Sequence, residues 1–171
     1  MRQIKVLVVE DSLVFRELLV TNLNKDPAIQ VVATATDPYE ARDKIIEYKP
    51  DVMTLDIELP RMSGLEFLRK LMPQYPMPVI VLSALSEKVF DAMQAGAVDF
   101  VAKPPAANKK DLENLLENEL PVKIKVASTA KISRIKHSVD AIDFRNNRRD
   151  DKKTIIAIGA STGGTEAIAT V

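Results

Sequence analysis

The stretch IKVLVVED, residues 4–11, sets the fold of the N-terminal part of this chain. Its first six residues, all apolar except Lys5, form the kind of short, β-branched run that is typical of a buried strand. Four similar runs follow, separated by stretches with the period of amphipathic helices. Because parallel neighbours need helical crossovers, five strands alternating with five helices predict an α/β fold with a doubly wound parallel sheet. The later runs cover residues 29–35, 52–55, 79–82 and 100–102.

Local signals predict several of the helices. Apolar residues recur at i, i+3, i+4 and i+8 within residues 15–23 and again within residues 112–120, which favours helices packed on a sheet. Asp37 followed by Pro38 is typical of an N-cap with proline at the first helical position. The helical pattern closes at about residue 120, where we expect the first domain to end.

Composition indicates a globular protein with two electrostatic regions. Of 171 residues, 46% are hydrophobic and 28% are charged, and there is no cysteine for a disulfide or a thiolate ligand. No run approaches the roughly 18 apolar residues of a membrane span, and no signal-peptide pattern precedes the first strand, so we expect a cytoplasmic protein without membrane insertion. Residues 1–120 carry 14 Lys/Arg and 19 Asp/Glu (net −5), whereas residues 121–153 carry 10 and 4 (net +6).

We therefore expect three parts: an α/β domain at 1–120, a basic interdomain linker at 121–153, and the N-terminal fragment of a second α/β domain at 154–171. The linker has one aromatic residue and no recognisable nucleic-acid-reading motif, which favours a solvated segment over a nucleic-acid contact. The third part begins with a buried strand, and GASTGG (residues 159–164) follows it.

Polar side chains follow four of the five predicted strands: Glu10 and Asp11 the first, Asp56 the third, Ser83 the fourth and Lys103 the fifth. Ligands of open parallel sheets bind beyond the carboxyl ends of the strands, so we expect these groups to lie together. Converging carboxylates without His or Cys favour Mg²⁺, which would offset their repulsion. One carboxylate could then attack a phosphoryl group, while the metal and a lysine stabilise the negative charge on the phosphoryl oxygens.

Each of these residues alone has a simpler explanation. Asp11 could cap a helix, Asp56 could cap a turn, and Lys103 could be solvated, because such residue types do so routinely. Four strand ends that carry suitable groups in a suitable order favour a site.

These strand-end residues, together with IELP (57–60) and MSG (62–64) after Asp56, resemble the receiver domains of two-component response regulators over about residues 3–120. The resemblance implies a flavodoxin-like sheet of order 2-1-3-4-5. It also implies phosphorylation of Asp56 by a histidine kinase. Mg²⁺ would be held by Glu10, Asp11, Asp56 and the backbone carbonyl of Glu58.

The same resemblance implies how the phosphate would be sensed. Ser83 and Lys103 would contact the phosphoryl group, and Phe100 would follow Ser83 inward as an aromatic switch. By position alone, Phe100 is equally well an ordinary core aromatic. A cis peptide bond is implied before Pro104.

The second motif, GASTGG, stands between a strand and a helix, where amides can stabilise an anion or small residues can serve close packing. It fits neither Gly-x-Ser-x-Gly nor a Walker loop. Residues 156–168 around it, together with the receiver in front, resemble the chemotaxis protein-glutamate methylesterases of the CheB family. The resemblance implies that Ser161 is the nucleophile that demethylates chemoreceptors, with glutamine deamidation as a further activity, and that a chemotaxis histidine kinase is a partner.

An esterase of this kind also needs a histidine base and an aspartate. The single histidine, His137, precedes Ser161 and does not fit the order of the family. We expect the chain as written to stop before the catalytic His and Asp and to be inactive as an esterase.

One segment departs from the resemblance. Ser86 with Glu87 predicts the start of a helix that Gly96 ends, and the stretch from Ser83 to Gly96 is a few residues shorter than the family leads us to expect. This shortening concerns the output face rather than the acceptor chemistry.

Three other interpretations remain open at this point. The chain could be a stand-alone receiver that acts by phosphorylation-dependent docking to a partner. It could be an aspartate-dependent phosphatase, although Glu58 stands where an Asp-x-Asp motif has its second aspartate. A DNA-binding regulator is a further alternative, but no helix-turn-helix pattern follows residue 120.

Overall fold

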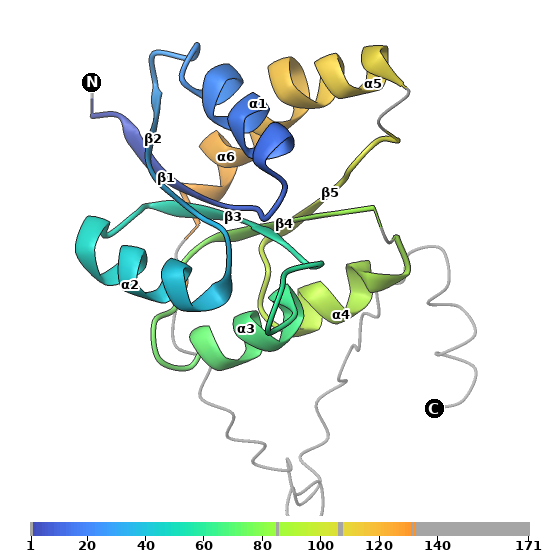
Figure 1. Cartoon of the computed structure of the whole chain (residues 1–171). Helices are drawn as coiled ribbons and strands as arrows, with labels where there is room; N and C mark the ends of the chain where they lie inside the picture. Colours follow the sequence, from blue (N-terminus) through green and yellow to red (C-terminus); the bar gives the residue numbers. More distant parts are fainter. Residues whose placement is uncertain (1, 85, 106–107, 131, 133–171) are drawn as a thin grey trace, which may run out of the picture. The chain divides into compact units, whose positions relative to one another are not determined.

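The computed structural model describes residues 2–84, 86–105, 108–130 and 132. Five parallel strands form one sheet in the order β2-β1-β3-β4-β5 (Figure 1). Both the doubly wound α/β fold and the predicted strand order are confirmed. The strands are β1 (Ile4–Val9), β2 (Ile29–Ala35), β3 (Val52–Asp56), β4 (Val79–Ser83) and β5 (Asp99–Ala102).

Helices cover both faces of the sheet (Figure 1). One face packs against α1 (Leu13–Leu23) and the helical segment after β5. The other face packs against α2 (Pro38–Tyr48), α3 (Gly64–Leu71) and α4 (Val89–Gln94). Within the part of the chain that the structure describes, no helix combines the length and apolarity needed to cross a bilayer.

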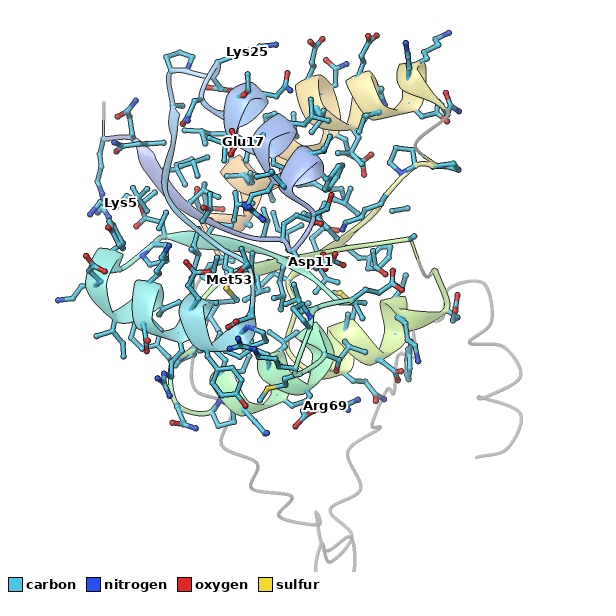
Figure 2. The ribbon with its side chains drawn as sticks, viewed as in Figure 1. Lys5, Asp11, Glu17, Lys25, Met53 and Arg69 are labelled. Carbon is cyan, nitrogen blue, oxygen red and sulfur yellow. The ribbon has the colours of Figure 1, made fainter. Side chains whose placement is uncertain are left out.

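The apolar run of β1 is buried on both sides of the sheet. Because side chains alternate along a strand, Val6 and Val8 enter the core beneath α1, whereas Leu7 and Val9 enter the core against α2 and α3. All four are fully buried, and each contributes about 1.5–3 kcal/mol through burial. Figure 2 shows the side chains that fill both layers, with Met53 of β3 in the interior.

Two predicted helix signals are confirmed. Asp37 caps α2, because its carboxylate accepts hydrogen bonds from the backbone N–H groups of Tyr39 and Glu40, and Pro38 begins the helix. Gly96 follows the end of α4 with φ +104°, a left-handed conformation that glycine adopts without strain. These local signals therefore position the helices as the sequence predicts.

The start of α4 differs from the prediction. Ser86–Lys88 forms a single 3₁₀ turn, and the α-helix begins only at Val89. Lys88 occupies the N-cap position without a side-chain cap hydrogen bond, so the N-terminus is completed by the tighter 3₁₀ turn. The helix itself is six residues long.

The helical segment after β5 extends past the predicted domain end. It comprises α5 (Lys109–Asn114), a π-helical turn η2 (Leu115–Glu119) and α6 (Leu120–Ala127). In the π turn, the Leu120 N–H donates to the carbonyl of Leu115, five residues earlier. The wider turn accommodates Pro121, which has no N–H to donate and would crowd a regular helical carbonyl.

Residues 121–127 of the predicted linker thus form a helix, and this helix packs on the sheet. Leu120, Pro121, Ile124 and Ala127 of α6 are buried, so this helix completes one face of the sheet. The sequence period is hard to recognise here because Pro121 and two lysines interrupt it. Beyond α6 the structure describes residues 128–130 and 132, and the remainder of the predicted linker and the fragment 154–171 lie outside the described residues.

The packing of α6 against the sheet makes a prediction about stability. Ile124 is fully buried and Val126, two residues on in the same helix, is 64% exposed. We expect Ile124→Ala to lower the free energy of unfolding by about 2–5 kcal/mol, because it leaves a cavity. The control Val126→Ala should change it by less than about 0.5 kcal/mol. Urea unfolding monitored by circular dichroism measures both, and equal small effects would place α6 outside the cooperative domain.

Candidate functional site

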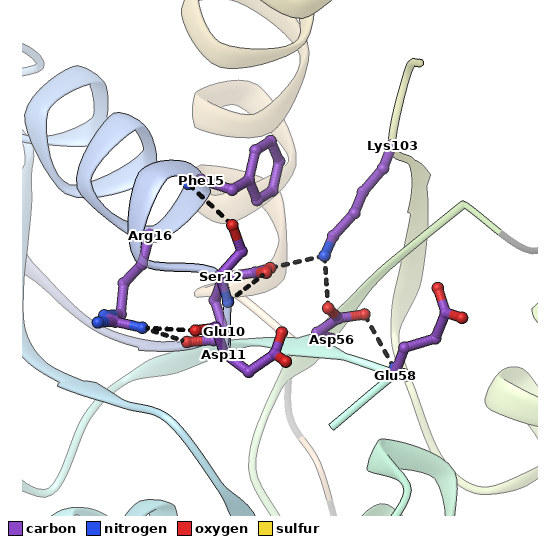
Figure 3. Close-up of polar contacts among 8 residues, drawn as sticks. All are labelled: Glu10, Asp11, Ser12, Phe15, Arg16, Asp56, Glu58 and Lys103. Atoms are coloured by element: carbon purple, nitrogen blue, oxygen red, sulfur yellow. Dashed lines mark hydrogen bonds and ion pairs between the residues drawn. The ribbon is translucent and has the colours of Figure 1, made fainter. Parts of the chain in front are cut away.

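The last residue of β3 and the residues that follow β1 and β5 bring four charged side chains together at the carboxyl edge of the sheet (Figure 3). Glu10, Asp11 and Asp56 each offer a carboxylate oxygen, and these oxygens lie within 4.8 Å of one another. The ammonium Nζ of Lys103 lies 2.6 Å from Glu10 Oε2 and 2.5 Å from Asp56 Oδ2. The convergence predicted from the strand ends is present in the structure.

The cluster is largely shielded from solvent. Glu10 is 1% exposed and Asp56 3% exposed, whereas Asp11 is exposed. Burial raises the pKa of Glu10, because the charged form loses hydration, and the charge of Asp56 adds to this rise. The hydrogen bond and positive charge of Lys103 act in the opposite direction. Three carboxylates thus face one ammonium, which leaves an excess of negative charge.

Arg16 and Ser12 hold the loop that carries two of these carboxylates. Arg16 Nη1 donates to the backbone carbonyls of Glu10 (2.8 Å) and Asp11 (3.2 Å). The Ser12 N–H donates to Glu10 Oε1 (3.3 Å), and its hydroxyl caps α1 by accepting from the Phe15 N–H. Sequence reasoning missed both residues. A serine just before a helical period is an N-cap signature that could have revealed Ser12, but no sequence signal indicates the contacts of Arg16.

Gly64 lets α3 approach the backbone of Asp56. A Cβ at position 64 would lie 2.0 Å from the Asp56 carbonyl oxygen, a distance that no side chain can occupy. The Gly64 N–H donates to the carbonyl of Ile57 (2.9 Å). The Glu58 N–H donates to Asp56 Oδ1 (3.0 Å), while the Glu58 side chain is exposed. The loop after β3 is therefore fixed against the helix that follows it.

Ser83 and Phe100 lie on the neighbouring strands. Ser83 ends β4, is fully buried, and accepts a hydrogen bond at its carbonyl from the Lys103 N–H (2.9 Å). Phe100 pairs with Val81 in the β4–β5 ladder and packs, partly buried, against the core on the α2, α3 and α4 side. The structure thus brings Ser83 beside Lys103. A response of Ser83 or Phe100 to phosphate stays a prediction.

The peptide bond between Lys103 and Pro104 is trans, so the expected cis bond is wrong. A trans bond before proline is favoured by about 0.5–1 kcal/mol when nothing in the surroundings selects the other isomer. Lys103 reaches both carboxylates from this trans backbone.

Ser161, the predicted nucleophile of the second motif, lies outside the described residues, and so does the single histidine, His137, to which no catalytic role is assigned. A hollow of about 500 Å³ lies between α2 and α3, lined mainly by apolar side chains such as Phe67 and Tyr75. It contains none of the predicted site residues. The chemistry of the described part of the chain is therefore concentrated at the acidic edge of the sheet and not in this hollow.

The acidic edge fits a hard divalent cation. Its potential ligands are carboxylate oxygens, with the Glu58 carbonyl nearby in sequence, and Mg²⁺ prefers oxygen ligands of this kind. Two of the three carboxylates are buried, so a cation beside them would offset a repulsion that solvent screens poorly.

Comparison with known proteins identifies the described domain. The family model of the response regulator receiver domain matches residues 6–117. A protein-glutamate methylesterase/protein-glutamine glutaminase of Syntrophomonas wolfei is 58% identical over 168 residues, which are 98% of this chain and 49% of that protein. The corresponding protein of Syntrophotalea carbinolica is 48% identical over 98% of this chain and 50% of its own length. The chain thus spans about half the length of the curated relatives it matches.

A solved structure resembles the fold and the sequence together. The response regulator domain of Thermotoga maritima CheB superposes with a TM-score of 0.70 at 39% identity, and the match covers 76% of this chain and 99% of that one. A CheX–CheY–BeF₃–Mg²⁺ complex from Borrelia burgdorferi matches with a TM-score of 0.55 at 31% identity over 67% of this chain and 88% of that one.

The electrostatic role of Lys103 predicts the effect of removing it. In metal-free buffer at pH 7, we expect Lys103→Met to lower the free energy of unfolding by about 3–5 kcal/mol, because two buried carboxylates lose their compensating charge. The control Lys109→Met, at an exposed position, should have little effect. Urea unfolding over a range of pH measures both variants.

The pH dependence of this loss has a definite sign. The pKa of Glu10 is raised above its ordinary value of 4.5 in the folded protein, and without Lys103 it should rise further. The folded state then binds a proton before the unfolded state does, so stability is regained as the pH falls from neutral toward 4.5 and is lost as it rises. A deficit that stayed constant with pH would contradict the electrostatic explanation.

Proposed function

The chain belongs to the response regulator receiver family, and on this basis we propose that Asp56 is its phosphoryl acceptor. The observation that carries the proposal is the contact of one Asp56 oxygen with the Lys103 ammonium inside a cluster of three carboxylates. The other Asp56 oxygen is oriented by the Glu58 backbone N–H. The Ser12 N–H orients the other Glu10 oxygen in the same way, so the position of Asp56 at the end of the third strand of a receiver fold is what favours it as the acceptor. The Asp56 carboxylate is thus held in place, and the neighbouring ammonium and a bound cation can stabilise the negative charge that a phosphoryl group adds.

The proposed reaction is the transfer of a phosphoryl group from a phosphohistidine or a small acyl phosphate. A carboxylate oxygen of Asp56 attacks phosphorus, the bond from phosphorus to the donor breaks, and the donor leaves with the electron pair. Glu10, Asp11, Asp56 and the Glu58 carbonyl would hold Mg²⁺, which supplies positive charge against the phosphoryl oxygens. Lys103 keeps its proton and pairs with a phosphoryl oxygen.

We propose that Ser83 and Phe100 change conformation when Asp56 is phosphorylated and so transmit the change to the rest of the domain. The buried position of Ser83 at the end of β4, bonded to the Lys103 backbone, supports a hydroxyl that turns toward the phosphoryl group. Phe100 lies on the neighbouring strand and is only partly buried, which supports a ring that moves between an exposed and a buried position.

We further propose that this receiver regulates a protein-glutamate methylesterase of bacterial chemotaxis, with Ser161 as its nucleophile. The curated relatives carry that activity in their names and align over 98% of this chain, a span that includes the GASTGG motif. The proposed partners are a chemotaxis histidine kinase and methylated chemoreceptors, in the cytoplasm. Phosphorylation would then shift the population in which the catalytic site is accessible.

The acceptor proposal predicts a simple mass change. Incubation with acetyl phosphate and Mg²⁺ should add one phosphoryl group to the wild type and none to Asp56→Asn, because an amide oxygen is not a nucleophile of comparable strength. Excess chelator should prevent the addition, and Asp11→Asn should slow it by about tenfold or more through the loss of metal-binding charge. Intact-mass spectrometry measures each outcome.

The matched control is Asp43→Asn, which removes an exposed carboxylate of α2 that pairs with Arg42. It should be labelled like the wild type. Labelling that persists in Asp56→Asn would place the acceptor elsewhere, and absence of labelling in the wild type under all conditions would contradict phosphoryl transfer altogether.

The methylesterase proposal can be tested with a chimera. Residues 1–171 are joined to the part of the Syntrophomonas wolfei relative that the alignment leaves unmatched. We expect methanol release from methylated chemoreceptors to rise on addition of acetyl phosphate, not to rise when the chimera carries Asp56→Asn, and to be abolished by Ser161→Ala. Release that is the same with and without the phosphodonor would show that this receiver does not regulate the esterase.

A further inference from the structure

A phenylalanine ring lies against the lysine of the acidic site. The Nζ atom of Lys103 is 4.9 Å from the centre of the Phe15 ring, and Figure 3 shows the ring beside the ammonium from the first turn of α1. Phe15 is partly buried and packs against the core beneath α1. Neither the strand-end pattern nor the proposed reaction assigns it a role.

The Lys103 ammonium lies close enough to the ring for a cation–π contact in addition to its two hydrogen bonds. Lysine has three N–H donors, and two acceptors lie in hydrogen-bond contact, Glu10 Oε2 and Asp56 Oδ2. The face of an aromatic ring carries negative charge density and attracts a cation within about 6 Å of its centre, the more so where water is excluded. Lys103 has only 17% of its side chain exposed, so this attraction is weakly screened.

Hydrogen bonds fix the position of the ring relative to residues 10–12, the acidic loop before α1. The Phe15 N–H donates to the Ser12 hydroxyl, and the Ser12 N–H donates to Glu10 Oε1. The next residue, Arg16, binds the carbonyls of Glu10 and Asp11. The first turn of α1 and the loop before it therefore form one hydrogen-bonded unit, which sets the ring and the carboxylate of Glu10 on two sides of the same ammonium.

We propose that Phe15 is a positioning residue for phosphoryl transfer. Its ring holds the Lys103 ammonium between Glu10 and Asp56, where it can pair with a phosphoryl oxygen as the bond from Asp56 to phosphorus forms. Phe15 itself gains and loses no atom or proton. The inference rests on the proposed role of Asp56 as acceptor, and it adds a residue that acts only through Lys103.

The test separates the charge–ring contact from ordinary packing. Phe15→Leu keeps an apolar side chain but removes the ring, whereas Phe15→Tyr keeps the ring face. We expect Phe15→Leu to slow labelling by acetyl phosphate about 3- to 30-fold, the range that corresponds to the loss of one cation–π contact. Phe15→Tyr should stay within about twofold of the wild type, as should Val14→Ala, at a neighbouring position that is 72% exposed.

A second arm combines these changes with Lys103→Met. Without the ammonium the ring has no cation to hold, so Phe15→Leu should then have no further effect on the labelling rate. An equal additional loss in this background would show that Phe15 acts through packing and would overturn the proposal. Unfolding midpoints of all variants establish that the rates compare folded proteins.

A third arm needs no phosphorylation and keeps this inference separate from the acceptor proposal. Acetylation of Lys103 by an N-hydroxysuccinimide ester, quantified by peptide mass spectrometry against the exposed Lys109, reports how firmly the amine is held. We expect faster modification of Lys103 in Phe15→Leu and an unchanged rate in Phe15→Tyr. If the wild type is never phosphorylated, the acceptor proposal fails while this comparison still decides whether the ring holds the lysine; equal reactivity in both variants overturns the positioning role.

Discussion

The bridge from the Lys103 ammonium to Glu10 and Asp56 is the interaction on which the acidic edge depends. Two like charges about 4 Å apart repel by about 4 kcal/mol at the effective dielectric of a protein near its surface. Lys103 offsets much of this repulsion, but three carboxylates still exceed one ammonium. The cluster therefore keeps a net negative charge. This charge favours binding of a divalent cation, which in turn allows a phosphoryl group to approach.

Packing holds the groups around this bridge in fixed positions. The parallel sheet brings the ends of β1, β3 and β5 to one edge, and α3 lies so close to Asp56 that only glycine fits at position 64. Arg16 fixes the backbone of the acidic loop from the other side. The carboxylates thus need little rearrangement when charge arrives, which is the condition under which oriented groups stabilise a reacting centre most strongly.

The strand that precedes Lys103, β5, is hydrogen-bonded to the last described helix. Lys123 of α6 donates to the Asp99 carboxylate (2.7 Å) and to the Phe100 carbonyl (3.2 Å), both in β5. A displacement of β5 at the acidic edge would therefore change these two contacts with α6, whose buried residues complete one face of the sheet.

The sequence by itself determined the parallel sheet and the residues that reach its reactive edge, and the resemblance to receiver domains implied the strand order. Buried parallel strands leave a strong signal, because both faces must be apolar, and a polar residue at a strand end then stands out, as Asp56 and Lys103 do. Tertiary structure decided what depends on contacts between distant segments: the position of Phe15 over Lys103 and the burial of α6 beyond Pro121. These features leave no local sequence pattern, because the contacts that stabilise them join residues that are distant in sequence and become neighbours only on folding.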